Sequence, residues 1–84
     1  MDTNKYNCVY SRWLDGKVAA AVYQVRNSAD EPLVGYAVFL HQEDWIKEQR
    51  WFCDFHEARN HADDHAACLI INYGMKEVIF TEAF

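Results

Sequence analysis

The 84-residue sequence has little proline, glycine and cysteine, and it has fewer basic than acidic side chains. Eight Lys and Arg stand against thirteen Asp and Glu, which gives a formal charge of −5 at pH 7. This balance argues against direct binding to nucleic acids or anionic membranes, because both require clustered cations. No apolar run approaches the ~18–20 residues of a membrane span, and the N-terminus lacks the basic-then-apolar pattern of a signal peptide. The sequence therefore predicts a cytoplasmic protein.

The few glycines and cysteines exclude several kinds of site. Gly16, Gly35 and Gly74 are scattered, so neither a phosphate-binding loop nor a dinucleotide fingerprint can be drawn. The three cysteines are widely spaced and form no Cys-x-x-Cys pair, which is typical of reduced thiols in a cytosolic protein. We therefore expect no cofactor and no enzymatic activity.

What the sequence does contain is enough apolar material for one small core. Hydrophobic residues make up 51% of the chain and aromatic residues 15%, which argues against disorder. The length is about half of the ~150 residues usual for a domain, so residues 1–84 are predicted to form a single domain.

The first third of the chain predicts a β-hairpin. Asp15-Gly16 separates two runs rich in aromatic and β-branched residues, 6–14 and 17–26, and Asp-Gly favours the positive φ angles of a two-residue turn. We expect one face of this hairpin to carry a helix and the other to form a semi-apolar, aromatic surface that meets a partner. The predicted pairs are Leu14–Lys17, Trp13–Val18, Ser11–Ala20 and Val9–Val22.

A third strand is predicted over residues 33–41, after a polar turn that contains the only proline. Residues 42–51 do not alternate between apolar and polar types. They predict a short helical or irregular excursion, anchored by Trp45, Ile46 and Trp51.

The strongest local signal is a helix between Asp54 and Gly74. Asp54 and Glu57 fit a capping box at its start, and Gly74 is the type of residue that ends a helix in the left-handed conformation. At 100° per residue, one apolar stripe contains Phe55, Ala58, Ala62, Ala66, Leu69 and Tyr73.

A last strand is predicted over residues 76–81, which completes the order β-β-β-α-β. The predicted fold class is α+β, with one helix packed across one face of a small antiparallel sheet.

One edge of the predicted helix carries metal-ligand types. His61, His65 and Cys68 lie at i, i+4 and i+7, so two imidazoles and a thiolate share a face that a zinc ion could occupy. A metal-binding domain or small metal-assisted enzyme is therefore one alternative function. The other interpretation is that these residues flank the core, half-buried and hydrogen-bonded.

The negative charge is concentrated in residues 43–64. This stretch holds seven acidic and three basic side chains, and so contributes −4 of the −5. Because two tryptophans are interleaved with the carboxylates, we expect one contiguous surface that binds a basic partner. The other interpretation is that the acids solvate the helix while the tryptophans cover the core edge. The predicted partner-binding residues are Glu43, Asp44, Trp45, Glu48, Trp51, Glu57, Asp63 and Asp64.

Two further interpretations concern other surfaces. Arg12, Lys17 and Arg26 lie among aromatic residues in the hairpin, which is the basis of a weaker alternative, a DNA-binding sheet module. The helix end is apolar nearly all round, and Ile71 points away from the core stripe. Something must cover it, and a second subunit would do so, which predicts a homodimer.

The general build resembles small acidic proteins of phages and other mobile elements, which bind and block host nucleases or CRISPR effectors. The resemblance rests on size, charge and the lack of a catalytic signature. It implies a non-enzymatic protein-binding module, an anti-CRISPR-like or anti-nuclease inhibitor. Such a module would block a basic, nucleic-acid-binding site on a host protein without touching nucleic acid itself.

Overall fold

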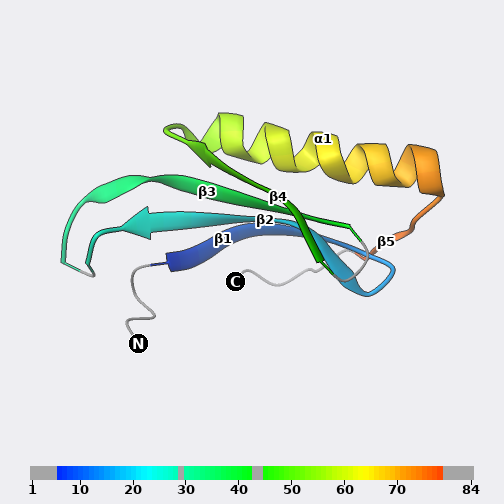
Figure 1. Cartoon of the computed structure of the whole chain (residues 1–84), viewed down its shortest axis with the longest axis horizontal. Coiled ribbons are helices and arrows are strands. Elements are labelled where there is room, and N and C mark those ends of the chain that lie inside the picture. Colours follow the sequence, from blue (N-terminus) through cyan, green and yellow to red (C-terminus); the bar gives the residue numbers. More distant parts are fainter. Residues whose placement is uncertain (1–5, 29, 43–44, 79–84) are drawn as a thin grey trace.

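The chain folds into an antiparallel sheet with one helix lying along one of its faces (Figure 1). The computed structural model describes residues 6–28, 30–42 and 45–78. Strands lie in the order β4-β3-β2-β1-β5. The elements are β1 (Tyr6–Leu14), β2 (Lys17–Arg26), β3 (Leu33–Gln42), β4 (Trp45–Phe52), α1 (Phe55–Tyr73) and β5 (Glu77–Val78). The predicted α+β class is confirmed.

The β1–β2 hairpin turns where the sequence predicts it. Asp15 and Gly16 have φ angles of 52° and 79°, as a two-residue turn of this type requires. The predicted pairs Leu14–Lys17 and Trp13–Val18 are present.

Two bulges then change the predicted register of the hairpin. Ser11 pairs with Ala21 rather than Ala20, and Val22 pairs with Tyr10 rather than Val9. Each bulge inserts one extra residue into one strand, so counting alternate residues from the turn fails beyond it. As a result, Tyr10 and Arg12 lie on the same side of the sheet as Val22 and Ala20, which face the helix. The predicted register placed them on the opposite side from these two residues.

The helical or irregular excursion predicted for residues 42–51 is wrong. Trp45–Phe52 forms the edge strand β4, which pairs with β3 from Gln42 back to Tyr36. Every residue of β4 except Phe52 is exposed. An edge strand that faces solvent on both sides has no need of alternating apolar residues, so the sequence carries no strand periodicity there.

Helix α1 begins and ends as its capping signals predict. The side chain of Asp54 accepts a hydrogen bond from the Glu57 N–H at 3.2 Å. At the other end, Gly74 adopts φ 65° and its N–H donates to the carbonyl of Ile70.

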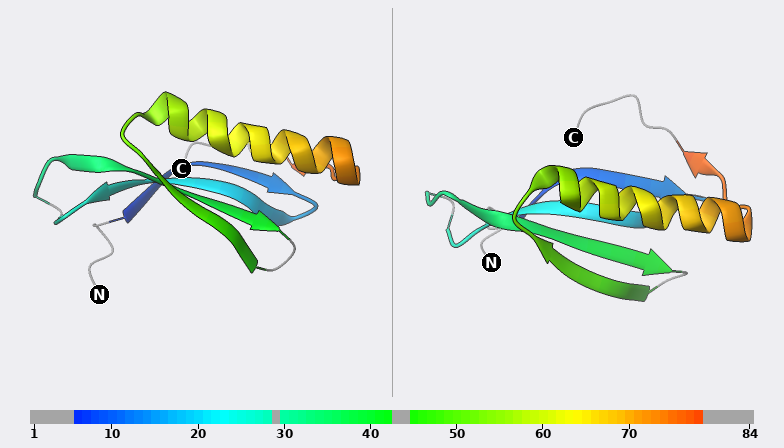
Figure 2. Two further views of the ribbon diagram at one scale, coloured as in Figure 1. Left: turned by 45° about the horizontal axis from the view of Figure 1, so that its top comes forward. Right: turned by 90° about the horizontal axis from the view of Figure 1, so that it is seen from above.

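The helix packs closely because its buried stripe is made mostly of alanine. Ala58, Ala62 and Ala66 have no exposed surface. They contact two groups of buried residues, one at the sheet centre and one near the hairpin turn: Ala20, Val22, Val38 and Leu40, and then Leu14, Ala19 and Leu69. Tyr73 does not belong to the buried stripe, since it is 65% exposed. Figure 2 shows that α1 covers one face of the sheet only.

The last predicted strand is seen in part. Glu77–Val78 forms β5, paired with Trp13 and Leu14 of β1, and residues 79–81 of the prediction lie outside the described residues. Among the described residues, no helix combines the length and apolar character needed to cross a membrane.

Candidate interaction surfaces

The structure distributes the predicted partner-binding residues over several surfaces. Glu43 and Asp44 lie outside the described residues. The others lie on two elements: Trp45, Glu48 and Trp51 on β4, and Glu57, Asp63 and Asp64 on α1.

The two tryptophans of β4 lie on opposite sides of the sheet. Trp45 pairs with Gln42 and Trp51 pairs with Ala37. Since side chains alternate along a strand, these pairings place Trp45 on the side of α1 and Trp51 on the opposite side. Their exposed fractions are 56% and 49%.

Trp51 is held against a glycine on β3. A Cβ atom placed on Gly35 would come within 2.5 Å of the indole Cζ2 atom and 2.9 Å of the Phe52 carbonyl oxygen. The absence of a side chain at Gly35 therefore lets the indole lie across the backbone of β3.

Glu48 faces the helix and contacts His61. The His61 Nε2 atom lies 2.6 Å from the Glu48 carboxylate. This hydrogen bond holds the pKa of Glu48 below its usual value. The contact joins β4 to α1 along one flank of the helix.

Asp63 lies on the other flank of α1, where it binds residues of β1. The Tyr10 hydroxyl and the Arg12 guanidinium both donate hydrogen bonds to its Oδ1 atom, the latter at 2.8 Å. Arg12 also pairs with Glu77 of β5. Arg59 lies 5.2 Å above the Tyr10 ring. We call Tyr10, Arg12, Asp63 and Glu77 the β1–α1–β5 network.

This network was not foreseen from the sequence, because each of its hydrogen bonds joins residues more than 50 positions apart. The hydrogen bonds that Arg12 donates to Glu77 and to Asp63 raise the pKa of Arg12, so the guanidinium stays charged. Burial, and then the hydrogen bond to Asp63, raises the pKa of Tyr10. Asp63 therefore joins α1 to β1 rather than extending an acidic patch, and Arg12 links both to Glu77 of β5.

The single contiguous acidic surface expected from residues 43–64 is not formed by the described residues. Glu48 and Asp63 face opposite flanks of the helix. The described residues contain nine acidic and seven basic side chains, a net charge of −2. The remaining −3 of the total of −5 belongs to residues outside them.

The candidate metal ligands are engaged elsewhere. The Nε2 atom of His65 lies 2.8 Å from the carbonyl oxygen of His41, and that of His61 contacts Glu48. Both acceptors require an Nε2–H donor, which leaves neither Nε2 lone pair for a metal. Cys68 is exposed and accepts a hydrogen bond from Asn72. Within the described part of the chain, no group of three or more His, Cys, Asp or Glu side chains could hold a metal ion.

Two of the basic residues of the hairpin already have partners within the fold. Arg12 is paired with Asp63 and Glu77 on the helix side. Arg26 donates a hydrogen bond to the carbonyl of Glu31. Arg12 and Arg26 are therefore not available to bind the phosphates of a nucleic acid whose bases stack on the aromatic side chains. This counts against the DNA-binding alternative.

The side of the sheet opposite α1 forms what we call the open face. The ladder pairs place two rows on it that run from β1 to β4, Cys8–Tyr23–Ala37–Trp51 and Ser11–Ala21–Phe39–Gln49. They also place on it the row Tyr6–Val25–Gly35 from β1 to β3 and the pair His41–Ile46. None of these paired positions is Asp, Glu, Lys or Arg. The sequence predicted a semi-apolar aromatic surface on one side of the sheet, and this surface is present.

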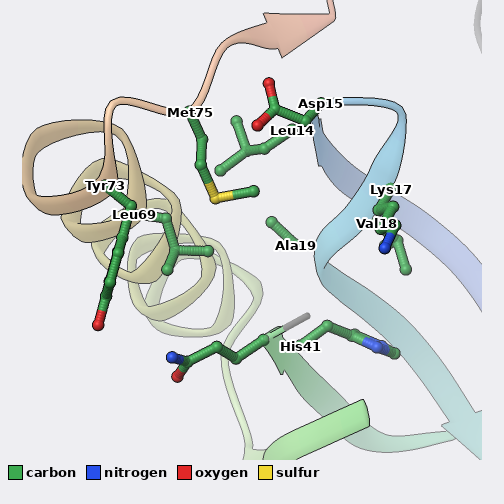
Figure 3. A pocket seen from close by; sticks show the side chains of 10 residues that line it. Leu14, Asp15, Lys17, Val18, Ala19, His41, Leu69, Tyr73 and Met75 are labelled. Carbon is green, nitrogen blue, oxygen red and sulfur yellow. The ribbon is translucent and has the colours of Figure 1, made fainter. Parts of the chain in front are cut away.

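A separate cavity of about 410 Å³ lies between the C-terminal end of α1 and the hairpin turn (Figure 3). Met75 reaches across it from the helix side toward Leu14 and Ala19. The lining contains no Ser, Thr or Cys, and its one hydroxyl group is that of Tyr73. His41 lies at its border, and burial together with the charge of His65 lowers the pKa of His41.

Protein-family models, curated proteins and solved structures were compared with this chain. None matched. The function is therefore argued from the geometry of these surfaces.

Proposed function

We propose that this protein is a non-enzymatic protein-binding module that uses the helix-facing side of β4 together with the acidic residues that precede β4 in sequence. The observation that carries the proposal is the exposure of β4, whose residues from Trp45 to Trp51 are all exposed. Trp45 is an anchor of the type that dominates protein interfaces, because an indole removes a large apolar area from water when it is covered.

The charge of this surface selects the partner. Glu43 and Asp44 directly precede Trp45 in sequence, and Glu48 follows it on the same side of β4. Carboxylates around an aromatic anchor speed the encounter with a basic surface and disfavour acidic ones. We propose a host protein with a basic, nucleic-acid-binding site as the partner. The module would act in the cytoplasm as an inhibitor of the kind found in phages.

β4 also carries features that oppose pairing with an arbitrary strand. Lys47 occupies the bulge between the Leu40–Glu48 and His41–Ile46 pairs. A bulge and a lysine on an edge strand both hinder strand addition. Recognition through side chains, rather than through the backbone of β4, therefore fits this edge better.

Co-purification with matched variants tests the proposal. The test variant combines Glu43→Lys, Asp44→Lys and Trp45→Ala. The control combines Asp64→Lys and Ile71→Ala, which reverses an exposed acid and truncates an exposed apolar side chain on α1. We expect a basic host protein to be retained by the wild type and the control and lost by the test variant. Equal retention by the test variant would refute the assignment of the surface.

A further inference from the structure

We propose that the open face is the interface of a symmetric homodimer, in which two sheets pack face to face and the helices lie outside. The inference does not depend on the proposed function, because the binding surface of β4 lies on the other side of the sheet.

The absence of charge is what suits this face to a second copy of the same chain. In a two-fold interface each residue type meets the same surface, so any net charge on the face would be opposed by itself. The paired positions of the open face are aromatic, aliphatic or neutral polar, while the charged residues Glu48, Arg50 and Arg12 lie on the helix side. Dimerisation would therefore bury no ionised side chain from these positions, which removes the largest desolvation cost.

The open face also has the area that a dimer needs. Its four long strands contain 8–10 residues each. At the usual rise and spacing of strands, the face is roughly 30 Å long and 15–20 Å wide, about 500 Å² in projection. Side-chain relief increases the accessible area above this projection, toward the ~600–1,000 Å² per partner of specific interfaces. Twisted sheets of this size pack at about −30° to each other.

The open face carries both a hollow and a projecting side chain, so two copies related by a two-fold axis could fit together. A hollow of about 330 Å³ is bordered by aromatic and aliphatic side chains from all four strands, namely Tyr6, Tyr23, Phe39, His41 and Ile46. Trp51 lies on the same face beside Gly35, and its indole is 49% exposed. A two-fold axis between the indole and the hollow would place the Trp51 ring of each copy against the hollow of the other.

The C-terminal end of α1 is an alternative dimer surface, and an experiment can distinguish it from the open face. Ile71 is 79% exposed on α1, and it was the basis for predicting a homodimer from the sequence. It lies beside the exposed polar residue Asn72, and the exposed Tyr73, two positions further on, points to another side of the helix. A scattered exposed residue of this kind is normal on a monomer surface, whereas a continuous face across four strands is not.

Sedimentation equilibrium across a concentration series tests the proposal. The variants are Phe39→Lys and Ile46→Lys on the open face, with Ile71→Lys as the matched control, and circular dichroism verifies that each folds. Ile46 is 51% exposed, so its replacement should leave the fold intact even if that of Phe39 does not. We expect a dimer for the wild type and Ile71→Lys, and at least a tenfold rise in the dimer dissociation constant for Ile46→Lys.

Two results would overturn the proposal. One is a wild type that stays monomeric up to about 100 µM, where a specific interface would be occupied. The other is a dimer that survives Ile46→Lys and dissociates in Ile71→Lys. Neither result bears on host-protein binding by β4, so the two proposals fail separately.

Discussion

Removal of the Asp63 charge should destabilise the fold far more than removal of the charge of Asp64, its neighbour in sequence. In Asp63→Asn the hydrogen bonds from Tyr10 and Arg12 lose their charged acceptor. Hydrogen bonds to charged groups contribute about 1.5–3 kcal/mol, and exposed ion pairs about 0–1 kcal/mol. The side chains of Asp63 and Arg12 are 32% and 21% exposed, which places this case between the two. We expect a loss of about 1–2 kcal/mol.

The assay is thermal and urea unfolding followed by circular dichroism at pH 7, with Asp64→Asn as the control. For a domain of this size, 1 kcal/mol shifts Tm by about 4–8 °C, so Asp63→Asn should lower Tm by about 5–15 °C. Asp64 is exposed, and its replacement should change the free energy of unfolding by less than about 0.5 kcal/mol. Equal effects at the two positions would refute the structural role of Asp63.

The same network predicts a signature at alkaline pH. Burial and the Asp63 hydrogen bond raise the Tyr10 pKa, so the folded state holds that proton more tightly than the unfolded state. The resulting stability is fully present below pH 10, the usual Tyr pKa, and is lost as the pH rises through the raised value. The difference in unfolding free energy between wild type and Asp63→Asn should therefore narrow above about pH 10. If this difference in unfolding free energy stays constant above pH 10, the Tyr10 hydroxyl does not contribute to the stabilisation by Asp63.

Three further predictions concern the backbone and acid pH. Gly35→Ala should cost about 1–3 kcal/mol and alter tryptophan fluorescence, because its Cβ would collide with the Trp51 indole and with backbone; unchanged stability and emission would contradict this packing. Gly74→Ala should cost about 1 kcal/mol in urea unfolding, because φ is 65° there. His41 has a lowered pKa, so the free energy of unfolding should fall by up to about 1 kcal/mol as the pH drops from 6.5 to 5.5, and by less in His41→Gln. The same fall in both proteins would exclude His41 as its source.

The elements predicted correctly are those with local signals. The Asp15-Gly16 turn, the Asp54 cap and the Gly74 stop each depend on a few neighbouring residues, and all three are confirmed. The alanine stripe of α1 also follows from spacing alone. The fold class follows from these elements, because one helix must bury its stripe against the sheet.

The parts that could not be predicted depend on the rest of the fold. β4 lacks alternation because both of its sides reach solvent, and the exposed run Lys47–Arg50 looks like a solvated helix or loop. The bulges of β1 and β2 bring Tyr10 to the same side of the sheet as Val22, against the predicted register, and no local sequence signal marks them. The sequence grouped Asp63 with the acidic surface because its partners on β1, Tyr10 and Arg12, are remote in sequence.

The candidate site was predicted in part. The sequence indicated that Trp45, Glu48 and Trp51 lie near one another, and all three are on β4. It could not indicate that Trp45 and Trp51 lie on opposite sides of the sheet, since a strand was not expected there. The open face was foreseen as aromatic, but its lack of charge appeared only once the ladder pairs were known.

The most direct test of the central claim is displacement of nucleic acid from the host protein captured by co-purification. Labelled nucleic acid bound to that protein is titrated with the wild type, with the Glu43→Lys, Asp44→Lys, Trp45→Ala variant and with the Asp64→Lys, Ile71→Ala control. We predict that the wild type and the control release the nucleic acid when about one molar equivalent has been added to the host protein. The Glu43→Lys, Asp44→Lys, Trp45→Ala variant should not release it. Nucleic acid that stays bound when the wild type saturates the host protein would contradict the claim.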